Sequence, residues 1–384
     1  MEKIRNLLHK VEVIKRQNDA ILDATGARFN IIGLCGVAHN ELMHSRILGE
    51  FLNPKGSHSL KNAFLDEFLK TLKSLSNNDD VVVLNTEKSN LYLEYHVNRL
   101  GRIDILVEDG ENALIIENKL FAQDQNQQLY RYDSFAKDKF KNYTIVYLTL
   151  DGHDASEQSR VNDEDEVSYI KISYKETIVQ WLEECVKHAI YHPLVRETLV
   201  QYINHLKTLT HQDMNAKNKE EVLDAMKSNI EASFVVANNI VNLKNHIINT
   251  EFLRQMHEVA EELNIKFVSK EGNYVNTSWA GFLFEIPDTP NYNMRLEFQN
   301  IGLRNLIIGA ILKSKDCDDS SFDKIKENYG TKGNDRWAYR YFTEYQNWDS
   351  KAFTDILNGE MKKAIKNELE IILEVIKDAE GVKN

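Results

Sequence analysis

Residues 143–150, with the sequence YTIVYLTL, constrain the fold of this chain more than any other segment. The run is almost continuously apolar and rich in β-branched and aromatic residues, which is typical of a strand. A strand of this kind is usually buried on both faces of its sheet. The segment therefore predicts a central sheet that is covered on both sides.

Helical and strand-like patterns alternate around this strand. Helices are expected at residues 2–24, 40–52, 60–75, 124–138, 176–190 and 193–210, and further strands at 81–84, 91–97, 102–107, 113–120 and 168–172. The strands before residue 121 should be antiparallel, because an Asp-Gly turn joins two of them. This order predicts an α/β core with a mixed sheet.

The second half of the chain has a separate pattern. Apolar residues thin out over residues 210–222, and we expect a domain boundary there. Beyond it we expect helices at 219–247, 250–263 and 351–380, and strands at 265–268, 282–286, 294–298 and 306–312. Residues 1–30 are thus expected to form a helix packed on the core, residues 31–213 the first domain, and residues 214–384 a second α+β domain.

Charge and composition exclude several classes of protein. The net charge of −12 argues against a protein that coats nucleic acid nonspecifically, although a local basic groove remains compatible with it. The chain contains no apolar run of about 18 residues and no apolar signal segment at its N-terminus, so we expect no membrane association and a cytoplasmic location. Cys35, Cys185 and Cys317 are odd in number and widely separated, which indicates free thiols.

The hairpin RIDILVEDGENALIIENKL carries charged residues within its strands. If the Asp-Gly pair at 109–110 is a two-residue loop, Asp104 lies opposite Ile115. Asp104 then shares a face with Glu117 and Lys119, and lies diagonally from Glu117 at roughly 7–8 Å between backbones. A four-residue loop would keep these three side chains on one face, whereas a three-residue loop would separate them.

Two carboxylates and an ammonium on one sheet face make poor packing but a good site for a hard cation. Mg²⁺ prefers oxygen ligands, often takes only one or two carboxylates, and keeps water molecules that a phosphate can displace. Such an ion can activate a water molecule, and Lys119 would orient that water or neutralise the charge of the transition state. The set is suited to phosphodiester hydrolysis.

A resemblance to a known family rests on these residues. Asp104, followed after twelve residues by Glu117-Asn118-Lys119, resembles the Asp…(Asp/Glu)-x-Lys signature of the PD-(D/E)XK nuclease superfamily. The first motif lacks the proline of the family name, which is common in the superfamily. The order of elements over about residues 30–210 also resembles its core. The resemblance implies a restriction-endonuclease-like core, a mixed sheet flanked by helices.

Further residues resemble elements of the superfamily. Gln128 and Tyr132, an i,i+4 pair, look like the Gln-x-x-x-Tyr motif of its exonuclease-type members. Glu41 lies on the helix where members often supply an additional acidic ligand, and His44 follows on the same helix. Each of these residues also has an ordinary interpretation, because Glu41 would favour the helix dipole and His44 is a typical core histidine.

The resemblance implies a role for each residue. Mg²⁺ or Mn²⁺ would be bound by Asp104, Glu117, Glu41 and the backbone carbonyl of Asn118, and Lys119 would position the water. Gln128, Tyr132 and His44 would support this site.

The implied activity is that of a metal-dependent nuclease. DNA is the expected substrate, with RNA left open, and the pattern looks like a bacterial branch that could act in defence against foreign DNA or in genome maintenance. The alternative is a catalytically silent binding or scaffold protein with the nuclease fold, which the acidic charge favours. Residues 214–384 could form a homodimer, bind a protein partner or sense a regulatory ligand.

Overall fold

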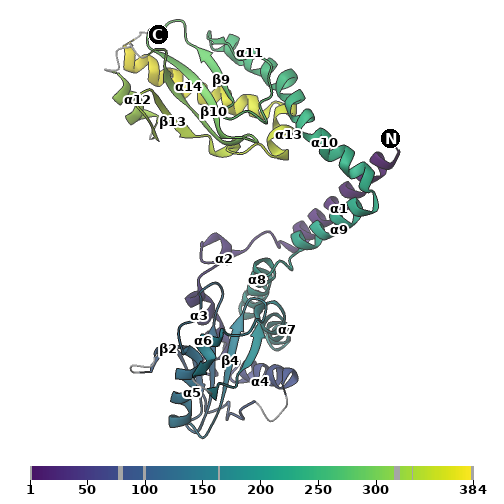
Figure 1. Cartoon of the computed structure of the whole chain (residues 1–384), viewed down its shortest axis with the longest axis vertical. Helices are drawn as coiled ribbons and strands as arrows, with labels where there is room; N and C mark the ends of the chain where they lie inside the picture. The colour runs from purple at the N-terminus through teal and green to yellow at the C-terminus, as the bar shows by residue number, and fades with distance from the viewer. Residues whose placement is uncertain are drawn as a thin grey trace. The chain divides into compact units, whose positions relative to one another are not determined.

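The computed structural model describes residues 2–76, 81–97, 101–162, 165–314, 321–330 and 332–381 of the chain (Figure 1). It divides into two compact units, Met1–Ser228 and Asn229–Asn384. The buried apolar residues fall into separate clusters in the two units, so each unit has its own core.

A mixed sheet of five strands forms the centre of the first unit. In spatial order the strands are β1 (Asn90–Val97), β2 (Gly101–Glu108), β3 (Asn112–Asn118), β4 (Asn142–Thr149) and β7 (Ile170–Ser173). The first three are antiparallel, and β4 runs parallel to both β3 and β7. A separate ribbon pairs β5 (Val161–Asn162) with β6 (Asp165–Glu166). The predicted mixed α/β sheet is confirmed.

Helices lie on both faces of this sheet. The helices of the first unit are α1 (Glu2–Thr25), α2 (Ile31–Leu34), α3 (Glu41–Leu52), α4 (Ala63–Leu75), α5 (Gln128–Lys139), α6 (Glu157–Arg160), the π-helix η3 (Tyr174–Ile178), α7 (Val179–His188), α8 (Pro193–Leu209) and α9 (Met214–Ser228). Leu114 and Ile116 of β3 join a core with α3, α4, α7 and α8, whereas Ala113 and Ile115 pack with α5 on the other face. Strand residues alternate between faces, so β3 is buried on both.

One predicted strand of the first unit is wrong. Residues 81–84 bury Val81, Val82 and Leu84 but form no strand. The backbone N–H of Val82 donates to the Thr144 hydroxyl at 2.8 Å instead of to a backbone carbonyl of a neighbouring strand. The apolar composition of residues 81–84 correctly predicted that they are buried. They form no strand, because the Thr144 side chain accepts the backbone N–H that would otherwise pair with another strand.

The second unit contains an antiparallel sheet of six strands. In spatial order they are β12 (Lys332–Gly333), β13 (Trp337–Tyr341), β11 (Arg304–Leu312), β10 (Tyr292–Asn300), β9 (Gly281–Glu285) and β8 (Lys266–Phe267). The helices are α10 (Ile230–Ile247), η4 (Ile248–Phe252), α11 (Leu253–Glu262), α12 (Phe322–Asn328), η5 (Thr343–Tyr345), α13 (Ser350–Asn358) and α14 (Glu360–Glu380). A second α+β region is therefore confirmed.

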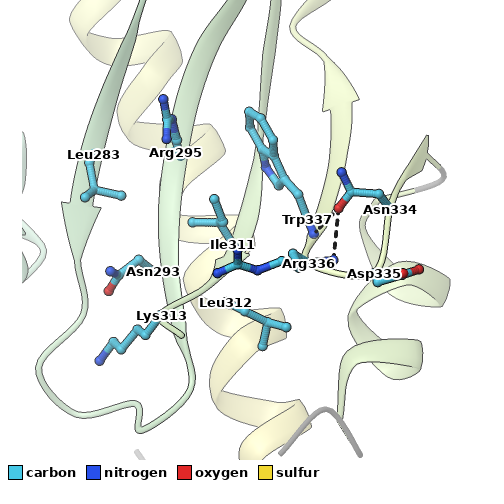
Figure 2. A pocket seen from close by; sticks show the side chains of 10 residues that line it. All are labelled: Leu283, Asn293, Arg295, Ile311, Leu312, Lys313, Asn334, Asp335, Arg336 and Trp337. Carbon is cyan, nitrogen blue, oxygen red and sulfur yellow. Dashed lines mark hydrogen bonds between the residues drawn. The ribbon is translucent and has the colours of Figure 1, made fainter. Parts of the chain in front are cut away.

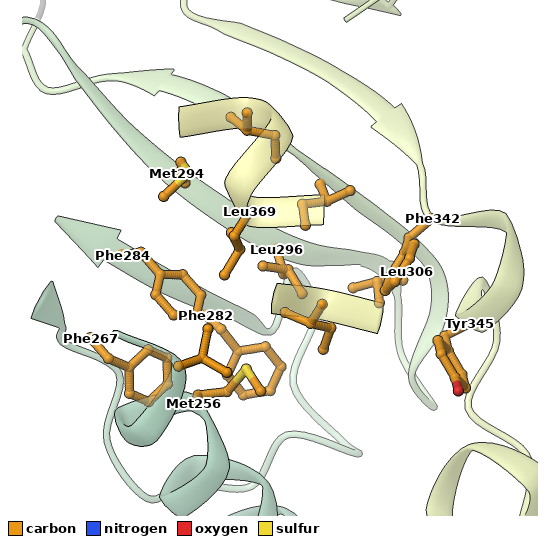
Figure 3. Close-up of a cluster of buried hydrophobic side chains, with 14 of the residues drawn as sticks. Met256, Phe267, Phe282, Phe284, Met294, Leu296, Leu306, Phe342, Tyr345 and Leu369 are labelled. Carbon is orange, nitrogen blue, oxygen red and sulfur yellow. The ribbon is translucent and has the colours of Figure 1, made fainter. Parts of the chain in front are cut away.

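The core of the second unit lies on one face of its sheet. Figure 3 shows Phe282, Phe284, Met294 and Leu296 of the sheet beside Met256 of α11, with Leu369 of α14 over them. Alternate strand residues point to this face, so the other face of the sheet carries a different set of side chains.

Two helices predicted as continuous are interrupted. The expected helix 219–247 becomes α9 and α10, which meet at Asn229 in a non-helical conformation (φ −129°, ψ 45°). The expected helix 351–380 becomes α13 and α14, because Gly359 adopts a left-handed conformation (φ 81°) that ends α13. The sequence prediction also lacked α12 and β13.

Helix α9 packs against α1 and is therefore counted with the first unit, which continues to Ser228. The division of the chain at residues 30 and 213 stays a prediction. In the described part of the chain, no helix combines the length and the apolar character that a membrane span needs. Cys35 and Cys185 are free thiols, and Cys317 lies outside the described residues.

Candidate active site

The hairpin of β2 and β3 corrects the predicted register. Ile105 pairs with Ile116 and Glu108 with Ala113, and the Asp109 N–H donates to the Asn112 carbonyl at 3.1 Å, so the turn is centred on residues 110–111 rather than 109–110. Continued one step beyond the Ile105–Ile116 pair, this register sets Asp104 opposite Glu117 instead of Ile115. The Asp109 carboxylate stabilises the shifted turn by accepting the backbone N–H groups of Glu111 and Asn112. The predicted common face is kept, and the two residues lie opposite each other rather than diagonally.

Glu117 lies at the centre of the site and is fully buried. Its Oε1 receives the Lys119 ammonium at 2.9 Å and the Gln128 side-chain amide at 2.5 Å. Its Oε2 is buried without a hydrogen-bond partner among the described residues. Burial, and then the charge of Asp104, raise the pKa of Glu117 to about 8. One carboxylate oxygen is thus satisfied by the protein and the other is not.

Asp104 is half-buried at the adjoining position of β2. Its Oδ2 accepts the backbone N–H of Asn118 at 2.8 Å. Burial first, and then the charges of Glu94 and Glu41, raise the pKa of Asp104 to about 6, against the opposing effects of this hydrogen bond and of Lys119. The site therefore holds more negative charge than its cation compensates.

Lys119 is the cation of the site. Burial alone would lower the pKa of its ammonium group, but the charges of Glu117, Asp104 and Glu41 outweigh burial and raise it. Lys119 is therefore protonated at neutral pH. In that state it can orient a water molecule or stabilise negative charge, and it cannot take up a proton.

Asn118 points to the opposite face of the sheet, as the alternation of β3 requires. Its side-chain NH₂ group donates to the Ser45 hydroxyl at 3.0 Å and to the Glu41 backbone carbonyl at 3.2 Å. Its side-chain oxygen, Oδ1, accepts the Tyr174 hydroxyl at 2.9 Å. The end of β3 is thereby attached to α3 and to η3. The central residue of the Glu-x-Lys motif thus has a positioning role through its side chain.

Glu41 is the first residue of α3, whose N-cap is Asn40 as expected. Its Oε1 accepts three consecutive backbone N–H groups, those of residues 120, 121 and 122, at 2.8, 3.0 and 3.0 Å. Burial would raise the pKa of Glu41, but these three donors together lower it. No hydrogen bond described for the chain uses Oε2, so this oxygen is available to a ligand.

Gln128 and Tyr132 lie one turn apart on α5. The Gln128 amide donates to the Tyr132 hydroxyl at 3.1 Å as well as to Glu117, and that hydroxyl donates to the Arg102 carbonyl at 2.6 Å. Burial and the neighbouring carboxylate raise the pKa of Tyr132, which keeps it neutral. The pair links the orientation of the Glu117 carboxylate to α5 and β2.

His44 is completely buried behind this site. Its Nδ1 lies 2.8 Å from the Tyr202 hydroxyl, and its Nε2 lies 3.1 Å from the Ala38 carbonyl. Burial lowers the pKa of His44 to about 4, so the ring is neutral, with Nε2 donating to the carbonyl and Nδ1 accepting from Tyr202. Both ring nitrogens are used, and the contacts join α3 to α8.

The sequence interpretation missed one carboxylate near the site. Glu94 of β1 lies between Leu93 and Tyr95, which pair with Ile105 and Ile103, so Glu94 occupies the position across from Asp104. Its backbone is left-handed (φ 52°), which is unusual for a residue inside a strand, and its carboxylate contacts Arg102 at 2.6 Å. A lone charge in an alternating strand was the only available signal.

The residues fit a divalent cation held by two carboxylates. The unpartnered Oε2 of Glu117 and the raised pKa values of both acids indicate negative charge that lacks a counterion. No group of three or more His, Cys, Asp or Glu side chains in the described ranges is arranged to hold a metal. Mg²⁺ commonly uses one or two carboxylates and retains water, so the pair formed by Asp104 and Glu117 suits it.

Comparison with known proteins agrees with this geometry. A family model described as the PD-(D/E)XK nuclease superfamily matches residues 29–204, which include every strand of the first sheet and all the residues described above. No curated protein and no solved structure matches the chain. The restriction-endonuclease-like interpretation of the mixed sheet and its flanking helices is confirmed by this match and by the observed topology.

Proposed function

Because residues 29–204 match the family model of the PD-(D/E)XK nuclease superfamily, we propose that the chain is a metal-dependent nuclease that hydrolyses phosphodiester bonds. The observation that carries the proposal is the juxtaposition of Asp104 and Glu117 on adjacent strands, with Lys119 on one carboxylate oxygen and no partner on the other. DNA is the proposed substrate, and defence against foreign DNA or genome maintenance the proposed setting.

In this proposal Mg²⁺ or Mn²⁺ is held by Asp104, Glu117 and the backbone carbonyl of Asn118, with Oε2 of Glu41 as an additional ligand. The ion would lower the pKa of a bound water and stabilise charge on the phosphate oxygens. Lys119 keeps its proton and orients the attacking water or neutralises the developing negative charge. Gln128 holds the Glu117 carboxylate, and Tyr132 holds Gln128. His44 keeps α3, and hence Glu41, in place.

The test is a cleavage assay on linear, circular and single-stranded DNA and on RNA, with Mg²⁺, Mn²⁺ or EDTA. We expect cleavage that depends on the metal and falls by at least about a hundredfold in Lys119→Ala, the effect of losing a charge-stabilising group. Lys171→Ala is the matched control, because Lys171 is an exposed lysine on β7 of the same sheet. Equal activity of Lys119→Ala and wild type would contradict the assigned role.

A catalytically silent nuclease fold is the second candidate, and one observation favours it. Glu117 is fully buried and its Oε1 already contacts both Lys119 and Gln128, so the site is closed by protein groups. Calorimetric titration with Mn²⁺ distinguishes the candidates. Metal binding without cleavage indicates that an activator is missing, whereas absence of both binding and cleavage supports the scaffold.

A further inference from the structure

The second unit has a sheet face that its core does not use. Along β10 and β13, the residues Leu296, Phe298 and Ala338 belong to the core and are buried. Their neighbours in sequence point to the other face and are half-buried: Arg295, Gln299, Tyr339 and Tyr341. Alternation of this kind is typical of an antiparallel sheet with one face open to solvent. We call the open side, formed by β9, β10, β11 and β13, the outer face.

Aromatic side chains form a row on the outer face. Trp337, Tyr339 and Tyr341 occupy alternate positions of β13, and the rings of Trp337 and Tyr339 lie 5.3 Å apart. At about 3.3 Å per residue the row is about 13 Å long. Gln299 of β10 holds the two tyrosines, because its amide contacts their hydroxyl groups at 3.5 and 3.2 Å. The rings are therefore positioned by neighbouring strands.

Cations accompany these rings. The Arg295 guanidinium lies 5.9 Å from the centre of the Trp337 ring, and the Lys332 ammonium lies 4.5 Å from the centre of the Tyr341 ring. Arg295 also contacts the buried carboxylate of Glu297, whereas no described carboxylate forms an ion pair with Lys332 or Arg336. Asp335 adds one negative charge at this edge. Glu344 and Glu368 line a pocket with Lys332, whereas at the other end of the row three cations, Arg295, Lys313 and Arg336, accompany the single carboxylate of Asp335.

A cavity of about 690 Å³ lies at the end of this row (Figure 2). Arg295, Lys313, Arg336 and Trp337 line it together with the amides of Asn293 and Asn334. Asn334 accepts the backbone N–H groups of Arg336 and Trp337 at 2.9 and 3.1 Å, which fixes the turn that presents Arg336. Two donors bordering the cavity, Nε of Arg295 and Nε1 of Trp337, are buried without an acceptor among the described residues, and Trp337 is only 9% exposed. The cavity thus borders two buried donors without acceptors and one carboxylate, that of Asp335, while Lys313 already donates to the carbonyls of Ile286 and Thr289.

We infer that the outer face binds single-stranded nucleic acid, with phosphates at Arg336 and Lys332 and unpaired bases on Tyr339 and Tyr341. Phosphate oxygens supply the acceptors and the negative charge that the face lacks, and flat bases stack on aromatic rings regardless of sequence. A duplex presents its phosphates but keeps its bases stacked inside. This inference deepens the proposed nuclease function by assigning recognition of an unpaired strand to the second unit.

The test measures binding without cleavage. Fluorescence anisotropy follows labelled oligothymidylate and oligouridylate of about 15 nucleotides, a length typical of such sites, added to the full chain carrying Lys119→Ala in EDTA. We expect Tyr341→Ala and Arg336→Ala each to weaken the affinity at least about fivefold. Tyr341→Phe keeps the ring and should bind like the parent, which separates loss of stacking from loss of folding. The two oligonucleotides distinguish DNA from RNA as the preferred strand.

The matched control is Arg254→Ala, because Arg254 is exposed on α11, which packs on the opposite face of the sheet. Unchanged affinity in Tyr341→Ala and Arg336→Ala would overturn the inference. So would a duplex or polyglutamate that competes as well as the single strand. The binding result does not depend on the cleavage assay, because binding is measured in a variant that lacks Lys119. A chain that binds single strands but never cleaves them would refute the nuclease proposal and leave this inference standing.

Discussion

At the residue scale, the position of Asp104 is unfavourable for a protein without bound metal. Its pKa is raised to about 6 from an ordinary value of 3.8, so the folded state holds a proton that the unfolded state has lost. Stability contributed by this proton is present below about pH 4 and is lost as the pH rises through about 6. Glu117, with its pKa raised to about 8, extends the loss towards pH 8. Metal-free protein should therefore become less stable across this range.

Asp104→Asn is expected to stabilise the metal-free protein at pH 8 while abolishing cleavage. The amide keeps an oxygen that accepts the Asn118 N–H group but removes the unfavourable charge, for a gain of about 1–3 kcal/mol. Urea unfolding in EDTA measures the difference, which should vanish near pH 4. Added Mg²⁺ should stabilise only the wild type. A variant less stable than wild type at pH 8 would show that the carboxylate is not strained by its neighbours.

At the element scale, the side chain of Asn118 connects β3 to α3 and η3. Asn118→Ala leaves the buried Tyr174 hydroxyl and the Ser45 hydroxyl without their partner and should lower the free energy of unfolding by about 1–3 kcal/mol. The backbone carbonyl proposed as a metal ligand remains, so some metal-dependent cleavage should persist, unlike in Lys119→Ala. Chemical denaturation and the cleavage assay check both parts. Asn142→Ala is the control, because Asn142 is exposed on β4 and its side chain makes one solvent-exposed hydrogen bond, to Asn112 at 2.9 Å, so the change in stability should be small and cleavage unchanged.

The sequence predicted these elements better than their detailed pairing. Charged residues inside an apolar hairpin identified Asp104, Glu117 and Lys119, because burial of such groups has few structural explanations. The register was wrong because the Asp109 side chain stabilises a turn one residue later in the chain, and local sequence does not show such a choice. Glu94 could not be found, since its position depends on how β1 pairs with β2. The partners of His44 and Asn118 lie far away in sequence and were equally inaccessible.

At the scale of the whole molecule, the sequence predicted two regions with separate cores, and the two units have them. The first unit continues to Ser228, beyond the segment around residues 210–222 where apolar residues thin out. The segment poor in apolar residues near residue 214 coincides with the start of α9. This helix is mostly polar, with Ala225 buried, and it packs against α1. A helix that is mostly exposed contributes few apolar residues, so composition alone cannot show that it belongs to the preceding unit. Only the contact with α1 shows it.

Truncation tests this assignment. A chain of residues 1–228 should fold cooperatively and retain metal-dependent cleavage, because it contains the whole first unit. A chain ending at residue 213 lacks α9 and exposes apolar residues of α1 such as Leu7 and Ile14, so it should unfold at lower temperature and aggregate more readily. Circular dichroism melts and cleavage rates of the two chains provide the comparison. If both chains behave alike, α9 contributes nothing to the first unit. If residues 1–228 are folded but cleave at a rate different from the full chain, the second unit regulates the first.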